Sequence, residues 1–115
     1  LKQLMKVIGT IGKHGRAVIV GRGANFILPP DDCFRVRVIS PQRVRVQNVV
    51  KSFNIPENEA KRRIIRTESD RRAFIRKYFN AEIADPVNYD MVINTGTVGV
   101  ESAVTAIAAF LGAVT

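Results

Sequence analysis

The sequence has almost none of the residues that usually carry metal, redox or nucleophilic chemistry. It contains one cysteine, Cys33, and one histidine, His14. A single cysteine excludes an internal disulfide framework and fits a reducing compartment. Neither residue has neighbours at metal-ligand spacing, so the sequence indicates neither a zinc site nor a Ser-His-Asp arrangement. We interpret His14 as a loop residue and Cys33 as a small buried thiol.

Long hydrophobic runs and a signal peptide are also missing. The longest uncharged segment, residues 102–115, is 14 residues long, whereas a bilayer-spanning helix needs about 20. We therefore expect a soluble cytoplasmic protein with no membrane partner. The chain does not begin with methionine, and a helical pattern is already under way at Leu1. This favours a single domain or a domain fragment over residues 1–115.

Two nucleotide-binding motifs are incomplete. A phosphate loop reads GxxxxGK[ST] after a strand, but here the pair Gly12-Lys13 has Val7 at the first glycine position and is followed by His14. The segment that begins at Gly21 starts like the dinucleotide fingerprint GxGxxG but lacks its third glycine. We reject both motifs.

Acidic residues are scarce relative to basic ones. The 18 Lys and Arg residues against 10 Asp and Glu residues give a formal charge of +8, and twelve of the 18 are arginines. The guanidinium group is a rigid fork of donors that suits bidentate phosphate binding. The composition therefore predicts a partner with negative charge, such as phosphates, a nucleic acid or an anionic surface.

Strand-like and helix-like patterns alternate along the chain. Short β-branched runs predict three strands, over residues 17–20, 34–39 and 91–93. Helical spacing predicts four helices, which cover residues 1–11, start at Ser40-Pro41 with Ser40 as the cap, start at Pro56, and cover residues 100–111. The continuous apolar run of the first strand is typical of a strand buried on both faces. The sequence thus predicts an α/β fold with a mostly parallel sheet and flanking helices.

An arginine between two glycines follows the first predicted strand. Ligands bind at the carboxyl ends of parallel strands, and the segment Gly21-Arg22-Gly23 lies at such an end. Glycine permits unusual backbone angles and close approach of other groups, so Arg22 can project toward an anion. The alternative is a turn whose arginine points into water.

A second basic stretch covers residues 61–77. Eight of the 18 cations lie in these 17 residues, and only Glu68 and Asp70 offset them. Residues 67–72 contain no apolar side chain. We therefore expect this part of the stretch to be mobile or bent.

The arginines of this stretch recur at helical spacing. On a helix Arg62 and Arg66 share a face, as do Arg72 and Arg76. Each like-charge pair costs about 0.2–0.5 kcal/mol unless an anion lies between its members. The spacing predicts a lid that holds phosphate. The alternative is a solvated helical face with an ion pair between Arg66 and Asp70.

The motifs VIVGRGANFIL and DPVNYDMVINTGTVGVESAVTAI, together with the arginine-rich stretch between them, resemble the C-terminal part of the cytidylate kinase-like family of P-loop nucleoside monophosphate kinases. The resemblance runs from about residue 17 to residue 111. It implies a P-loop kinase-like fold whose first strand and phosphate loop are absent from this chain. It also implies phosphoryl transfer from ATP to a nucleoside monophosphate, with ATP and Mg²⁺ as cofactors.

The resemblance also implies roles for single residues. The arginine of the family's G-R-D segment holds the acceptor phosphate and matches Arg22. The family lid carries R-x-x-x-D, with arginine on phosphate and aspartate on the ribose, which matches Arg66 and Asp70. The segment that contains Thr95 resembles the loop near the ATP adenine. The full set expected is Arg66, Arg72 and Arg76 as catalytic, Arg22, Arg66 and Asp70 as substrate-binding, and Arg62, Arg63 and Thr95 as cofactor-binding.

The sequence also departs from the family pattern. Gly23 replaces the aspartate that helps to read the cytosine base, and Ala73 stands where a further lid arginine is expected. Without the phosphate loop, this chain alone should not be a competent kinase, and it should either expose an apolar surface or pair with itself. The alternative function is a non-catalytic basic module that binds nucleic acid or regulates a partner.

Overall fold

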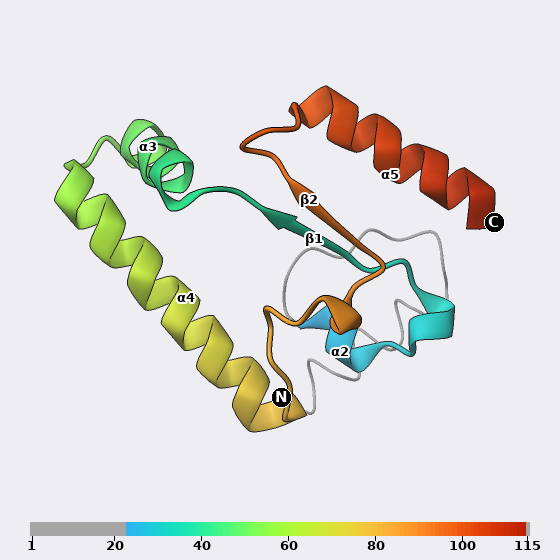
Figure 1. Cartoon of the computed structure of the whole chain (residues 1–115). Coiled ribbons are helices and arrows are strands. Elements are labelled where there is room, and N and C mark those ends of the chain that lie inside the picture. Colours follow the sequence, from blue (N-terminus) through green and yellow to red (C-terminus); the bar gives the residue numbers. More distant parts are fainter. Residues whose placement is uncertain (1–22, 115) are drawn as a thin grey trace.

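The computed structural model describes residues 23–114 (Figure 1). Arg22, His14, the first predicted helix and the predicted strand over 17–20 lie outside these residues. In chain order, the described elements are α2 (Ala24–Ile27), η1 (Pro30–Asp32), β1 (Val36–Ile39), α3 (Gln42–Phe53), α4 (Glu57–Phe79), η2 (Pro86–Asn88), β2 (Met91–Asn94) and α5 (Val100–Val114). The last two predicted strands and the last three predicted helices are therefore confirmed.

The two described strands form a parallel pair. Val36 of β1 lies opposite Met91 of β2, and the register continues to Ile39 opposite Asn94. Parallel strands need a long crossover, and α3 and α4 provide it (Figure 1). The described part of the chain is thus α-rich with a small parallel sheet, which is compatible with the predicted kinase-like α/β fold.

The start of α3 differs from the sequence prediction. Pro41, not Ser40, is the N-cap, and no side chain caps the helix. The Pro41 carbonyl accepts hydrogen bonds from the backbone N–H groups of Val44, at 3.0 Å, and Arg45, at 3.2 Å. Because a capping residue supplies the first intrahelical carbonyl, the helix begins one residue later than predicted.

Helix α4 is continuous from Glu57 to Phe79, so the bend expected over residues 67–72 is not present. Glu68, the second residue of that stretch, forms an ion pair with Arg45 of α3. This pair holds the stretch to a neighbouring helix although no apolar side chain does so. Glutamate and arginine are also good helix formers.

Two apolar clusters hold α4. Near its start, Ala60 and Ile64 pack against Val46 of α3, and all three side chains are buried. Near its end, Ile75 is only 2% exposed, and the ring of Phe79 stacks on Phe26 of α2 with centroids 5.6 Å apart. The helix is therefore fixed at both ends to different parts of the molecule.

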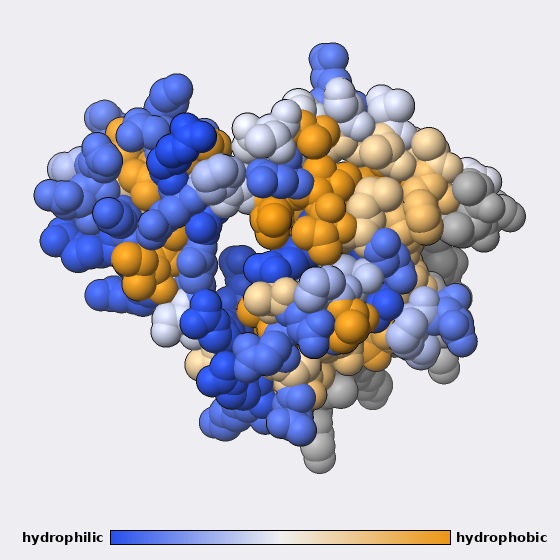
Figure 2. All heavy atoms as spheres, in the orientation of Figure 1, coloured by the Kyte–Doolittle hydropathy of each residue, from blue (hydrophilic) through white to orange (hydrophobic). Residues whose placement is uncertain are grey.

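Helix α5 presents much apolar surface. Its Val100 and Val104 are 70% and 59% exposed, and Figure 2 shows hydrophobic residues gathered over α5 and the adjoining strands. An exposed apolar surface, one of the two expected outcomes, is therefore present. Among the helices within residues 23–114, none combines the length and the hydrophobicity that crossing a bilayer requires.

Candidate functional site

The carboxyl ends of β1 and β2 lie against the start of α3. After β2, both the backbone N–H and the hydroxyl of Thr95 donate to the carbonyl of Ile39, at 2.8 and 3.3 Å. The next backbone N–H, of Gly96, donates to Asn94 Oδ1 at 2.9 Å. A Cβ atom at Gly96 would overlap Pro41 Cδ. The loop that contains Thr95 is therefore held closely, and its bonds go to the end of β1.

The remaining described candidates lie on α4, and all of them are exposed: Arg62, Arg63, Arg66, Asp70, Arg72 and Arg76. Arg62, Arg66 and Asp70 follow one another at intervals of four residues and so share a stripe of the helix. This stripe lies opposite the buried Ile64, because two residues correspond to a rotation of about 200°. In this part of the helix, Ile64 and the stripe of Arg62, Arg66 and Asp70 therefore lie on different faces.

Two of the α4 candidates already have carboxylate partners. Arg63 donates to Glu59 Oε1 at 2.9 Å, and its guanidinium carbon lies 5.9 Å from the centre of the Phe53 ring. Arg76 Nε donates to Glu82 Oε1 at 3.0 Å. To bind phosphate, either arginine would first have to leave its carboxylate.

The other α4 arginines are not neutralised. Within residues 23–114, Arg62, Arg66, Arg71 and Arg72 form no ion pair. The pair between Arg66 and Asp70, which the alternative interpretation expected, is also not formed there. Four arginines of this helix thus remain available to an anionic ligand.

Gly23 contacts the end of this arginine helix. Its backbone is left-handed, with φ of 68°, and a Cβ atom there would come within 3.3 Å of both Ile75 Cδ1 and Phe79 Cε2. Glycine adopts this backbone without strain, whereas other residues rarely do. A residue with a side chain at position 23 would therefore be both strained and crowded. The same contact places the residue that follows Arg22 in sequence against the last turns of α4.

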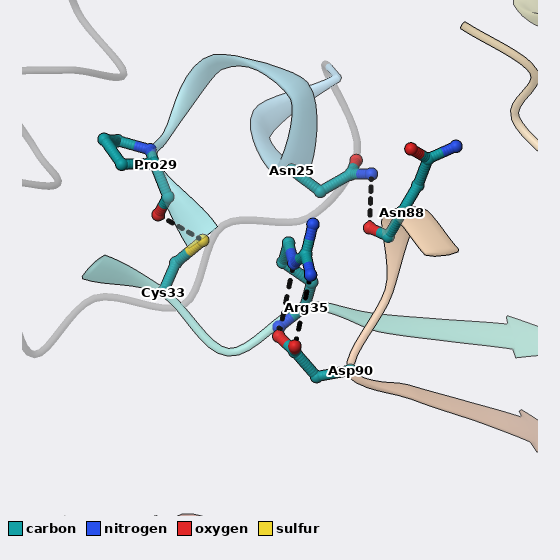
Figure 3. A network of polar contacts seen from close by, with 6 residues as sticks. All are labelled: Asn25, Pro29, Cys33, Arg35, Asn88 and Asp90. Carbon is teal, nitrogen blue, oxygen red and sulfur yellow. Dashed lines mark hydrogen bonds and ion pairs between the residues drawn. The ribbon is translucent and has the colours of Figure 1, made fainter. Parts of the chain in front are cut away.

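A polar clamp at the entry of the sheet was not predicted from the sequence. Arg35 precedes β1 and Asp90 precedes β2, and three donors of Arg35 reach the Asp90 carboxylate: the backbone N at 2.7 Å, Nε at 3.3 Å and NH2 at 3.2 Å (Figure 3). In return, the Arg35 carbonyl accepts from the backbone N–H groups of Asp90 and Met91. These hydrogen bonds hold the pKa of Asp90 below its ordinary value and raise that of Arg35. The clamp fixes the register of the parallel pair.

The neighbourhood of this clamp also corrects the expectation for Cys33. Its side chain is half-buried rather than buried, and its Sγ lies 3.5 Å from the Pro29 carbonyl (Figure 3). Nearby, Asn25 Nδ2 donates to the Asn88 carbonyl at 3.5 Å. This bond joins α2 to η2, just before β2.

We expect Asp90→Asn to lower the free energy of unfolding at neutral pH by about 1–2 kcal/mol, the scale of a charge-assisted contact that is partly exposed. Because the folded-state pKa lies below the ordinary 3.8, this stabilisation is complete above that value and is lost as the pH falls through the folded pKa. Denaturant titrations from about pH 6 down to about pH 2.5 should show the difference between the two proteins shrinking with acid. A difference that stays constant over this range would contradict the role of the carboxylate charge.

The comparisons with known proteins agree with this architecture. A solved structure of an uncharacterized protein from Eubacterium ventriosum ATCC 27560 matches 96% of this chain with a TM-score of 0.84 and 21% sequence identity. At that identity the likeness concerns the fold. This chain spans 65% of that protein's length.

No curated protein matches this chain. The model of the cytidylate kinase-like family matches residues 1–97, which include the arginine-rich helix and the end of β2. The match confirms the resemblance inferred from the sequence motifs. Because it covers most of the sequence, the chain belongs to the cytidylate kinase-like family.

Proposed function

We propose that this chain supplies the acceptor-binding and lid parts of a phosphotransferase that moves a phosphoryl group from ATP to a nucleoside monophosphate. One observation carries the proposal. The helix with four unneutralised arginines ends against Gly23, the residue that follows the predicted acceptor-binding Arg22. Gly23 therefore lies against the last turns of the helix that carries these arginines.

The chemistry required of such a site is mainly electrostatic. Phosphoryl transfer depends on positioning the reactants and on stabilising the charge of the transferring group, with little covalent work for the protein. The arginine side chain stays protonated at any working pH. Its guanidinium group can donate two parallel hydrogen bonds to two oxygens of one phosphate. In this proposal Arg22 fixes the acceptor phosphate, and Arg66 and Asp70 hold phosphate and ribose. Arg72 and Arg76 stabilise the transferring group.

The donor nucleotide would be held by Arg62 and Arg63, at the start of the same helix, and by the loop that contains Thr95. A polyphosphate offers enough charge to compete with Glu59 for Arg63, and the transferring phosphoryl group would compete with Glu82 for Arg76. Closure of the arginine helix over both nucleotides would also exclude water from the transferring group.

The described residues do not fit a protein-held magnesium ion. No group of three or more His, Cys, Asp or Glu side chains within residues 23–114 could bind a metal. Mg²⁺ is commonly held by one or two carboxylates plus substrate phosphates, so in this proposal the nucleotide would bring it. We assign no step to it.

We expect Arg66→Ala to weaken the binding of a nucleoside monophosphate about tenfold, which corresponds to about 1.4 kcal/mol. Arg71→Ala is the matched control, because it removes an equally unpaired and exposed arginine of α4 that points away from the stripe with Arg66 and Asp70. Titration calorimetry on the whole chain compares the two. Equal affinities for the two variants would overturn the assignment of Arg66.

Amide exchange supplies a second readout of the same proposal. Residues 67–72 should exchange more slowly when donor and acceptor nucleotides are present together, and much less so with either alone, because only the pair supplies charge to both sides of the lid. Unchanged exchange in the presence of both nucleotides would contradict the lid.

A further inference from the structure

The outer face of α3 carries a basic stripe that the proposed kinase site does not use. Arg43, Gln47 and Lys51 follow one another at intervals of four residues and are exposed, so they share one side of the helix. Together with Val44 and Asn48 they line a shallow hollow of about 320 Å³. The buried Val46 lies on the other side of the helix, against α4.

A second hollow continues this surface toward α4. It measures about 140 Å³ and lies between the two helices, and the residues that line it are Gln42, Arg43, Val46, Gln47, Glu57 and Lys61. Arg43 and Gln47 line both hollows. The two hollows therefore form one surface, which runs from Lys51 along α3 and reaches Lys61 on α4.

This basic groove is defined by Arg43, Gln47, Lys51 and Lys61, and its cations are not neutralised. Within residues 23–114, none of these three cations forms an ion pair. Arg45, on the same helix, does pair with Glu68 across the contact between α3 and α4. The helix pair thus neutralises the arginine at its contact and leaves the cations of the groove without partners.

The spacing of these cations indicates the kind of anion. Arg43 and Lys51 are eight residues apart, about 12 Å along the helix axis, so the two side chains would have to bend toward each other to share one phosphate group. A chain of phosphates can contact each of them without this rearrangement. Lys61 lies on the second helix, off the line of the other two, and a flexible strand can turn to reach it whereas a duplex is stiff over such a length.

We propose that the basic groove binds the sugar-phosphate backbone of a single-stranded nucleic acid. The side-chain amides of Gln47 and Asn48 supply donors and acceptors for phosphate and sugar. No aromatic side chain is among the residues that line the hollows, so bases have no stacking platform there. Binding through the backbone carries no direct base readout, so it does not depend on sequence.

The test measures the binding of a fluorescent single strand of 16 thymidine nucleotides to the whole chain at several salt concentrations. The logarithm of the binding constant should fall linearly with the logarithm of the salt concentration. Three phosphate contacts predict a slope of about −2 for this line, because each contact on a single strand contributes about −0.7. The double variant Arg43→Ala/Lys51→Ala should reduce the slope to about −0.7. The matched control is Arg71→Ala/Lys77→Ala, which removes one exposed arginine and one exposed lysine from α4 outside the groove, and it should keep the original slope.

Each outcome decides the proposal. Equal losses in the two double variants would show attraction to net charge alone and would overturn it, as would no binding at low salt or tighter binding of the matching duplex. Circular dichroism checks that both variants fold. Nucleoside monophosphate binding should be unchanged in Arg43→Ala/Lys51→Ala, so this proposal and the proposed kinase function can fail separately.

Discussion

Ile64→Ala is expected to lower the free energy of unfolding by about 2–5 kcal/mol, the usual cost of truncating a large aliphatic side chain in a core. Ile64 is 9% exposed and packs with Val46 and Ala60 in the cluster between α3 and α4. A cavity at this position would remove much of the contact that joins the two helices. Such a loss is a large fraction of the stability of a small protein.

The neighbouring isoleucine allows the same substitution at an exposed position, which serves as the control. Ile65 is 52% exposed, so Ile65→Ala should cost less than about 1 kcal/mol. Denaturant unfolding followed by circular dichroism measures both variants. Equal destabilisation by the two substitutions would mean that the packing of α4 on α3 differs from the structure described.

Gly96→Ala is expected to cost about 3 kcal/mol, near the upper end of the usual cost of overpacking. The new Cβ atom would overlap the ring of Pro41 and would come within 3.0 Å of Asn94 Oδ1. Neither group is the end of a flexible chain, because Pro41 is the N-cap of α3 and Asn94 Oδ1 accepts from the Gly96 N–H. The loop after β2 would have to move away from α3.

Gly112→Ala is the control for this substitution. Gly112 lies within α5, and nothing lies within 4 Å of a Cβ atom built there. Alanine in the interior of a helix is more stabilising than glycine. This variant should therefore be as stable as the original chain or more stable by about 0.5–1 kcal/mol. Thermal melting of both variants tests the pair. If the Gly96→Ala protein melted at the same temperature as the original chain, Pro41 could not lie as close to residue 96 as described.

Local sequence patterns predicted most of the elements. Proline and acidic residues mark the start of α4 at Glu57, and the β-branched run from Val36 marks β1, so both were found without knowledge of the fold. The continuity of α4 through residues 67–72 could not be found in this way. The structure adds one contact that holds this stretch, between Glu68 and Arg45, and only the packing of the two helices creates it.

The candidate site was predictable only where it depends on local sequence patterns. Spacing alone placed Arg62 and Arg66 on one stripe of a helix, and the structure confirms the helix. The pairing of Arg76 with Glu82 and the crowding at Gly23 follow from how the chain packs around the end of α4. The clamp between Arg35 and Asp90 joins residues 55 apart, and no local pattern reports such a pair.

The parallel pairing of β1 with β2 sets an order of events during protein synthesis. The chain leaves the ribosome from its N-terminus, so β1 emerges more than fifty residues before β2, its partner within residues 23–114. The helices α3 and α4, which are joined by a short turn, can pack against each other as soon as both have emerged, because local contacts form faster than distant ones. Until Met91 is made, β1 presents an unpaired edge of the kind that can join another chain. In the interval between the synthesis of β1 and that of β2, the nascent polypeptide is therefore exposed to aggregation through this edge.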